Sequence, residues 1–293
     1  MKHNKTFKNM IKLRCSPKDK NVGKINNFSC YTEKSLLELR DLWNIRHEDK
    51  KINSNDPRII WELLRKYMQG ICNKESCWLK QNFVVSNKIN EFINEFAPLS
   101  PSIWKTNPNE WLSSVDIISV MKQYEKAYKC FEFFGPSPID FDSKRLNNTC
   151  VWDEICNLSL EDQLKRGKTK LGFIFNTDPH YKSGQHWISL FVNIKKGKIF
   201  FFDSAGNKIP KEINKLVDKI IQQGNKLNNK IKMVFDQNYP VEHQYGNTEC
   251  GVYSIYFIVH MLEDTVTGYY LKKHILKDLY MQKFRKLYFN DNL

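Results

Sequence analysis

Two apolar segments joined by a short basic turn constrain the fold of this chain more than any other feature. The segments "HWISLFVNI" (186–194) and "KIFFFD" (198–203) are rich in β-branched and aromatic residues, and a Lys-Lys-Gly-Lys turn joins them. Short apolar segments of this kind, separated by a glycine-containing turn, are typical of a β-hairpin. The pattern therefore predicts two neighbouring antiparallel strands in the second half of the chain.

Other segments show the period of helices or strands. Asp56-Pro57 predicts a helix start, because Asp is a common N-cap and proline is favoured at the first helical position. Pro136 and Pro138 are expected to end the region before them. Helices on one flank of a mixed, mainly antiparallel sheet indicate an α+β fold. Further helices are predicted at 35–47, 87–96, 111–128, 213–221 and 250–262, and further strands at 171–175 and 231–236.

A break in the helical pattern predicts two domains. The stretch "APLSPS" at 97–102 places two prolines and two serines between periodic segments. Such clusters mark loops and linkers. We therefore expect an N-terminal helical arm domain at 1–100 and a second domain at 101–293.

The composition is that of a globular protein with an excess of positive charge. Hydrophobic residues make up 41% of the 293 residues, no apolar run is long enough to span a membrane, and the formal net charge is +14. This charge favours acidic partners, nucleic acid first among them. The lysines are scattered, however, and no RNP-like, zinc-finger or helix-turn-helix pattern accompanies them. Nucleic acid is therefore a candidate partner through the basic surface.

The eight cysteines predict reduced thiols. The first residues lack the apolar run and cleavage site of a signal peptide, so a cytosol-like compartment is expected. Cys72 and Cys77 form a C-x4-C pair that could begin a zinc site, and Cys150 and Cys156 form the other close pair. No histidines complete a ligand spacing beside them. Structural thiols are therefore favoured over a metal site, and neither a metal nor a cofactor is expected.

Three reactive side chains are predicted to meet at the hairpin. His186 opens one strand and Asp203 closes the next, so the antiparallel pairing brings both to the same edge of the sheet. Cys250 opens the helix at 250–262, where the positive end of the helix dipole stabilises a thiolate. An imidazole held by a carboxylate beside a thiol is the arrangement that nucleophilic catalysis requires.

Each residue of this group receives a predicted role. Cys250 is the nucleophile, His186 is the general acid and base, and Asp203 orients the imidazole. The side-chain amide of Gln244 and the backbone N–H of Cys250 are expected to stabilise an oxyanion. Gly251 is expected to leave room for the substrate carbonyl. His180 and His243 remain alternative bases.

The order and context of these residues resemble a known family. "GQHWISLFVNIKKGKIFFFDSAGN" and "HQYGNTECGVYSIYF" are similar to the ubiquitin-like-protein-processing (adenain-like, clan CE) cysteine proteases, which include the SUMO-specific proteases and adenovirus protease. "FDSAGN", "TECGVYS" and "YKCFEFFGPSPIDFD" further resemble the polyprotein-processing proteases of large cytoplasmic DNA viruses, of the African swine fever virus type. "GICNKESCW" (70–78) is similar to a stretch of the arm domain in that group.

The resemblance implies a SUMO-protease-like core and a thiol endopeptidase that cuts after Gly-Gly. Its substrates would be viral structural polyproteins with Gly-Gly-Xaa sites, and it would act in the virion and the host cytoplasm. Other functions remain open: a deubiquitinase or SUMO protease acting on host conjugates, an acyltransferase that uses the same triad, or a non-enzymatic basic virion protein. This chain departs from one viral relative of the group, which has Asn at the position of Asp203. Asp is the usual residue at this position in the wider clan.

Overall fold

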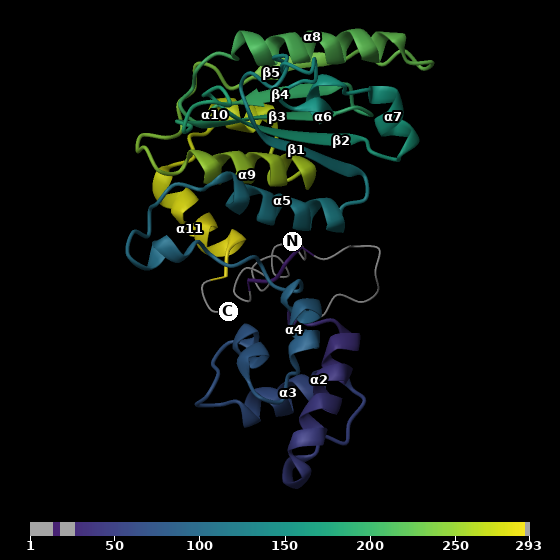
Figure 1. The fold of residues 1–293 in the computed structure, drawn as a ribbon, viewed down its shortest axis with the longest axis vertical. Helices are drawn as coiled ribbons and strands as arrows, with labels where there is room; N and C mark the ends of the chain where they lie inside the picture. Colours follow the sequence, from purple (N-terminus) through teal and green to yellow (C-terminus); the bar gives the residue numbers. More distant parts are fainter. Residues whose placement is uncertain (1–13, 18–26, 291–293) are drawn as a thin grey trace. The chain divides into compact units, whose positions relative to one another are not determined.

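A computed structural model describes residues 14–17 and 27–290 (Figure 1). The chain forms two compact units, which we describe separately. One contains the described residues of Met1–Ser100 together with the C-terminal segment from Arg285, and the other is Pro101–Phe284. The division at Ser100 and Pro101 falls within the proline-containing stretch 97–102, whereas the C-terminal segment lies with the first unit and not with the second.

The first unit is helical. Helix α2 begins after Thr32, whose side-chain oxygen accepts a hydrogen bond from Ser35 N. Helix α3 begins after Asp56, which caps it through Arg58 N and Ile59 N, with Pro57 at its start as predicted. The elements of this unit are α2 (Glu33–Arg46), η1 (Glu48–Lys50), α3 (Pro57–Tyr67), η2 (Glu75–Lys80) and α4 (Ser86–Ile93).

The second unit is a sheet with helices. Helix α5 begins with a capping box between Ser113 and Asp116. Helix α11 continues past Phe284 into the C-terminal segment of the other unit. The elements are η3 (Ser102–Lys105), α5 (Ser114–Ala127), β1 (Phe131–Pro138), α6 (Asp153–Cys156), α7 (Leu160–Lys165), β2 (Lys170–Asn176), β3 (Trp187–Asn193), β4 (Lys198–Phe202), α8 (Lys211–Lys226), β5 (Val234–Gln237), α9 (Cys250–Leu262), α10 (Gly268–Lys273) and α11 (Asp278–Tyr288).

The sheet is mixed and has the strand order β1-β2-β3-β4-β5. The predicted hairpin is present: β3 and β4 pair antiparallel, with Ser189 opposite Phe202 and Asn193 opposite Lys198. Strands β2 and β3 are also antiparallel, whereas the two edge pairings, β1 with β2 and β4 with β5, are parallel. The α+β class is confirmed, and the antiparallel pairings occupy the centre of the sheet.

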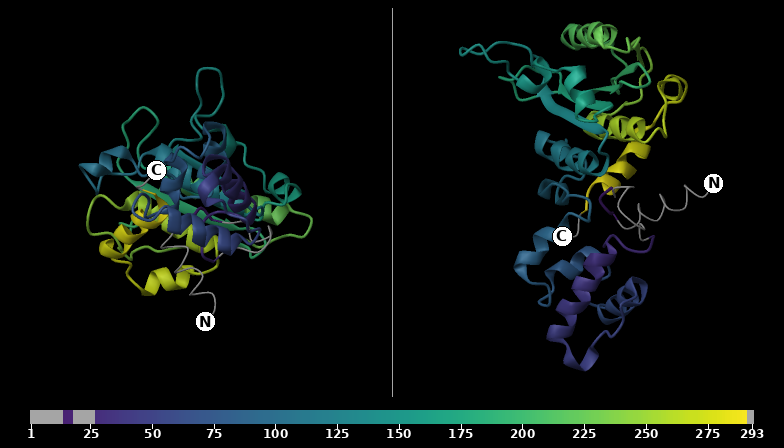
Figure 2. Two further views of the ribbon diagram at one scale, coloured as in Figure 1. Left: turned by 90° about the horizontal axis from the view of Figure 1, so that it is seen from below. Right: turned by 90° about the vertical axis from the view of Figure 1, so that its right-hand side faces the viewer.

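Helices cover both faces of this sheet and not one flank as expected. Alternate residues of β4 point to opposite faces. Phe201 belongs to a core cluster with Ile213 of α8, while Phe202 stacks on Phe257 of α9 at 5.1 Å between ring centroids. Figure 1 shows α8 on one side of the sheet and α9 and α5 on the other, and the right-hand view of Figure 2 shows the same layers from the side. Strands buried on both faces explain the nearly unbroken apolar runs.

Strand β1 was not anticipated, because its sequence "FEFFGPSP" ends in two prolines. It lies at the edge of the sheet, and its register with β2 shifts between Phe134 and Ser137, where Pro136 lies. An edge strand or a bulge is where a residue without an N–H is tolerated. Pro136 and Pro138, which were expected to end the region before them, therefore lie in the last residues of a strand. At the other edge β5 begins at Val234, later than the predicted 231.

The prediction of reduced cysteines is wrong for six of the eight in this structure. Cys15 is bonded to Cys30, Cys72 to Cys77, and Cys150 to Cys156. The C-x4-C pair is therefore a disulfide and not half of a zinc site. Cys130 and Cys250 are the free thiols. Within the described part of the chain, no helix is both long and apolar enough to cross a membrane.

The pairing of the cysteines predicts a thiol count. Protein purified without reductant and unfolded in guanidinium should give two titratable thiols, from Cys130 and Cys250, because the other six are cross-linked. After reduction the count should rise to eight. Eight thiols before reduction would contradict all three pairings, and peptide mapping identifies which pair is absent at an intermediate count.

Candidate active site

His186 and Asp203 meet at the end of the β3–β4 hairpin. His186 directly precedes β3 and Asp203 directly follows β4, so the antiparallel register brings them together. Nε2 of His186 lies 2.6 Å from Oδ1 of Asp203. Asp203 is 3% exposed, so this charged hydrogen bond is shielded from water.

The Asp203 carboxylate is fixed by its own neighbourhood. Oδ1 also accepts a hydrogen bond from Ala205 N at 2.9 Å, and Oδ2 accepts one from Asn207 Nδ2 at 3.1 Å. Fully buried Asn238 brackets the backbone of Asp203: its Oδ1 accepts from Asp203 N at 2.9 Å, and its Nδ2 donates to Asp203 O at 2.7 Å. The orientation of the carboxylate is therefore fixed by contacts that do not involve the imidazole.

Cys250 is the first residue of α9, as predicted, and is 2% exposed. Its side chain lies close enough to the imidazole of His186 to raise the pKa of that ring. Since Nε2 faces Asp203, Nδ1 is the ring nitrogen left for the sulfur. Burial lowers the pKa of His186, but the hydrogen bonds to Asp203 and Cys250 outweigh it and raise the pKa to about 10. The ring is therefore an imidazolium at neutral pH.

The position of Gly251 has a different reason from the one expected. A Cβ placed there would lie 2.9 Å from Cβ of Leu112 and 3.3 Å from Cδ1 of Trp187. Trp187 Nε1 in turn donates to Leu112 O at 2.9 Å. The space beside Gly251 is therefore filled by packed side chains and is not open to a substrate carbonyl. Glycine lets the start of α9 approach this pair of residues.

Gln244 is held in one orientation by two hydrogen bonds. Ser204 Oγ donates to its Oε1 at 2.8 Å, and its Nε2 donates to Gly246 O at 2.8 Å. The backbone N–H groups of His243 and Gln244 both donate to Ser204 O, at 2.8 and 2.9 Å. Because Ser204 follows Asp203 directly, one turn fixes both the carboxylate and the amide. An amide N–H of Gln244 and the backbone N–H groups at the start of α9 are available donors.

The loop between Gln244 and Cys250 is anchored from the C-terminal side. Asp278 Oδ2 accepts hydrogen bonds from Tyr245 N at 3.0 Å and Gly246 N at 2.9 Å. The Tyr253 hydroxyl lies 3.0 Å from Asp278 Oδ1 and 2.6 Å from Leu276 O. Burial, followed by the charge of Asp278, raises the pKa of Tyr253, so this hydroxyl remains a donor. The start of α11 therefore holds the loop that carries Gln244.

The alternative bases are engaged elsewhere. His180 Nδ1 lies 2.7 Å from Asp140 Oδ2, outside the group around Cys250. His243 is fully buried, and its Nδ1 accepts a hydrogen bond from Leu276 N at 3.0 Å. Burial lowers the pKa of His243 to about 4, so the ring is neutral. These contacts favour structural roles for both histidines.

A groove of about 800 Å³ adjoins the group through Trp187. Its lining includes Trp111, Leu112 and the backbone turn around Gly184. Trp187 is the residue after His186, so the groove lies beside the segment that carries the imidazole. Its mixed polar and aromatic walls suit a polypeptide.

The sequence predicted the side chains that meet at the hairpin but not the residues that position them. Ser204, Asn238 and Asp278 were missed, as was the packing of Leu112 against Gly251. Their contacts are made largely to backbone atoms of distant loops, and nothing in their local sequence distinguishes them from turn residues. The proximity of Ser204 to Asp203 in the sequence was the one available signal.

The chain is similar to known cysteine proteases in both sequence and fold. A model of the Ulp1 protease family, C-terminal catalytic domain, matches residues 119–293. The chain is 27% identical over 269 residues to a thiol protease of Acanthamoeba polyphaga mimivirus, covering 85% of this chain and 84% of that one. It is 31% identical over 255 residues to a cysteine protease of African swine fever virus (a tick isolate from Malawi), covering 83% and 92%. The crystal structure of an African swine fever virus protease shares the fold, with a TM-score of 0.66 at 22% identity over 95% and 98% of the chains.

The hydrogen bonds of His186 predict its titration. By NMR, His186 should stay protonated until the pH approaches about 10, while His243 and His260 should stay neutral down to about 4. A raised pKa means that the contribution of His186 to stability is complete below about 6.5 and is lost as the pH rises through about 10.

Replacing the carboxylate tests the cause of this shift. Asp203→Asn should lower the pKa of His186 markedly. Asp140→Asn is the matched control, because it removes the carboxylate from the other His–Asp pair and should leave His186 unchanged. A His186 pKa near 6.5 in the unmodified protein would contradict the geometry.

The anchoring of the loop predicts its exchange behaviour. Asp278→Ala removes the acceptor of two backbone N–H groups, so the amide hydrogens of Tyr245 and Gly246 should exchange at least about tenfold faster. Asp236→Ala removes a carboxylate that pairs with Lys272 and should leave both amides unchanged. Equal exchange rates in the two variants would show that Asp278 does not hold the loop.

Proposed function

Because the chain belongs to the Ulp1 protease family and is a cysteine peptidase, we propose that Cys250, His186, Asp203 and Gln244 carry its catalysis. One observation carries the proposal: Nε2 of His186 lies 2.6 Å from the Asp203 carboxylate, and the Cys250 side chain is close enough to raise the pKa of the same imidazole. The sulfur of a cysteine beside an imidazole that a carboxylate holds is the nucleophile of thiol catalysis.

The reaction follows from these positions. The sulfur of Cys250 attacks the carbonyl carbon of the scissile peptide, and the carbonyl oxygen takes the negative charge. Gln244 Nε2 and the backbone N–H of Cys250 donate to that oxygen. The imidazolium of His186 gives its proton to the leaving amine, which leaves a thioester. Neutral His186 then takes a proton from the water that attacks the thioester. The carboxylic acid product leaves, and Cys250 is released as a thiolate beside the imidazolium.

We propose that the bond cleaved follows Gly-Gly. The nucleophile is 2% exposed, and Leu112 and Trp187 fill the space beside the start of α9. A substrate segment without side chains reaches such a sulfur more easily than a bulky one. The family resemblance of the sequence and the viral origin of its relatives favour structural polyproteins as substrates. The sites of action would be the virion and the host cytoplasm.

A second candidate substrate is a host ubiquitin-like conjugate. Relatives from African swine fever virus, 32% identical over 124 residues, carry the name SUMO-1 cysteine protease. Such modifiers also end in Gly-Gly, so the same site would accept them. Assays with a Gly-Gly-Ala peptide, virion precursors, and ubiquitin and SUMO conjugates separate the two. Cleavage of conjugates alone would favour the host-directed function.

The mechanism predicts a graded set of variants. Cys250→Ser and His186→Ala should each abolish cleavage of the Gly-Gly-Ala peptide, because nucleophile or acid is lost. Gln244→Ala should lower kcat by roughly 10²-fold, as expected for one oxyanion donor. Circular dichroism should show an unchanged fold in each.

His274→Ala provides the control, because it removes an exposed histidine at the end of α10 that does not line the groove beside Trp187. It should retain the activity of the unmodified protein. A fully active Cys250→Ser protein, or loss of activity in His274→Ala equal to that in His186→Ala, is incompatible with the proposed roles.

A further inference from the structure

Two adjoining cavities of the N-terminal unit carry a concentration of positive charge. They enclose about 560 and 640 Å³ and share Arg58, Trp61 and Arg65 in their walls. Two carboxylates also line them: Glu62 bonds to Arg58, and Glu75 is buried. The cationic side chains around the two cavities, here called the arm cluster, are Arg14, Arg58, Arg65, Lys66 and Lys74.

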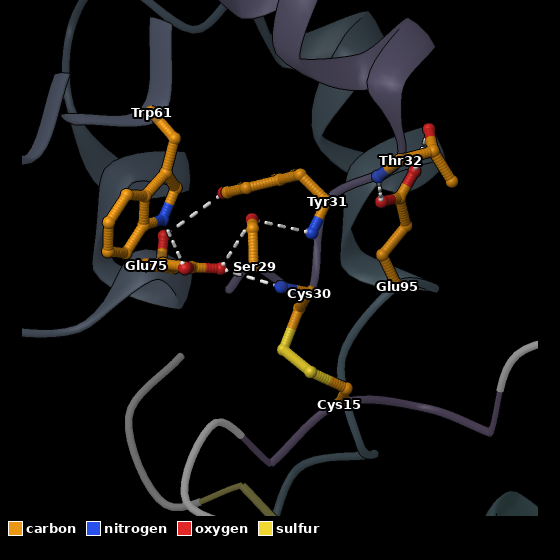
Figure 3. Close-up of a disulfide and its surroundings, with 8 residues drawn as sticks. All are labelled: Cys15, Ser29, Cys30, Tyr31, Thr32, Trp61, Glu75 and Glu95. Atoms are coloured by element: carbon orange, nitrogen blue, oxygen red, sulfur yellow. Dashed lines mark hydrogen bonds between the residues drawn. A yellow bond between two sulfur atoms is a disulfide. The ribbon is translucent and has the colours of Figure 1, made fainter. Parts of the chain in front are cut away.

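The indole of Trp61 is the fixed centre of this cluster. Its Nε1 donates to Oε1 of Glu75 at 2.5 Å. The other oxygen of Glu75 accepts hydrogen bonds from Ser29 Oγ at 3.0 Å and Cys30 N at 2.9 Å (Figure 3). Cys30 is itself tied to Cys15 by a disulfide. The plane of the indole is therefore set by a buried, hydrogen-bonded carboxylate.

Two arginines lie over this indole. Arg58 and Arg65 are three residues before and four after Trp61 on α3, which places all three on one face of the helix. The guanidinium carbons lie 5.7 and 5.2 Å from the ring centroid, and Arg58 also lies 4.8 Å from that of Phe28. A guanidinium stacked on an aromatic ring keeps N–H groups at its edge, which suits bidentate binding of an anion.

A second pair of cations strengthens the preference for an anion. Burial and then the charge of Arg14 lower the pKa of Lys74, and burial lowers the pKa of Arg14. Burial therefore acts on both groups, and the charge of Arg14 acts on Lys74 as well. A negatively charged ligand in the cavity would stabilise their charged forms.

The geometry selects the kind of anion. Trp61 is 9% exposed and lies under two guanidinium groups, so a base or an apolar side chain has little aromatic surface to stack on. Arginine clusters also bind acidic or phosphorylated peptide motifs, and the competition experiment below separates that class from nucleic acid. A row of phosphates needs only charge and N–H edges, and the net charge of +14 attracts a polyanion from a distance.

We propose that the arm cluster binds the phosphate backbone of nucleic acid without reading its sequence. Arg58 and Arg65 would make bidentate phosphate contacts, and Arg14, Lys66 and Lys74 would extend the contact along the strand. Binding is measured without any peptide substrate, so its outcome is independent of the proposed proteolytic function.

Fluorescence anisotropy of the full chain with labelled DNA duplexes of two unrelated sequences tests this. Arg58→Gln/Arg65→Gln should weaken binding at least about tenfold and reduce the slope of log K against log salt by about 1.8, at about 0.9 per phosphate contact. Lys66→Gln alone should reduce the slope by about 0.9. Both sequences should bind with equal affinity.

The matched control is Lys215→Gln/Lys226→Gln, which removes two exposed charges from α8 of the other unit. It should lower affinity much less and change the slope little. Equal effects of the two double variants, or a more than tenfold preference between the duplexes, would overturn the proposal. So would a polyglutamate peptide of equal charge that displaces the DNA as effectively as unlabelled duplex, because it would indicate an acidic polypeptide.

The arm variants are themselves checked for folding. Arg58, Arg65 and Lys66 lie on the surface of α3, so their replacement by glutamine should leave the thermal midpoint and the thiol count unchanged. Cleavage of the Gly-Gly-Ala peptide should also be retained. If the variants lose DNA binding and their N-terminal unit is also unfolded, the loss results from unfolding and the assignment to the arm cluster is rejected.

Discussion

The hydrogen bond between His186 and Asp203 depends on the register of one hairpin, and the rest of the site is arranged around it. The two residues come together because Ser189 lies opposite Phe202 and each strand ends where its reactive neighbour begins. Both faces of β3 and β4 are buried, so a slip of one residue would exchange the residues facing α8 and α9. Core packing therefore determines the geometry of the polar site.

The polar groups around Asp203 form a hydrogen-bonded network in which Asn238 makes three of the bonds. Asn238 bonds to both backbone groups of Asp203 and to Val241 O, although its side chain is fully buried. Burial of an amide without partners would cost several kcal/mol, so this arrangement is stable only when every partner is present. The network holds the carboxylate in one position and so fixes the orientation of the His186 ring.

Periodic segments of the sequence predicted most of the regular structure. The hairpin, the start of α9 at Cys250 and the cap of α3 by Asp56 followed from apolar alternation, helix capping and proline placement. The meeting of His186, Asp203 and Cys250 followed from strand and helix ends. Local rules were sufficient wherever the determining contacts were also local.

Long-range contacts account for what the sequence did not reveal. Asn238, Ser204 and Asp278 act on backbone groups of other loops, and such partners have no signature in their own neighbourhood. Strand β1 was hidden by prolines that only an edge position tolerates. The partner of Cys15 is fifteen residues away, at Cys30, and depends on the packing of the whole N-terminal unit.

The adjacency of Asp203 and Ser204 has a consequence for how the site varies. One peptide unit carries the partner of the imidazole on one side and the partner of the Gln244 amide on the other. Gly206, with φ of +71°, closes this turn against the backbone of Val241 and Glu242, where a Cβ would lie 2.9 Å away. The position of the carboxylate beside His186 and the position of the Gln244 amide therefore shift together, and a substitution in this turn cannot adjust one and spare the other.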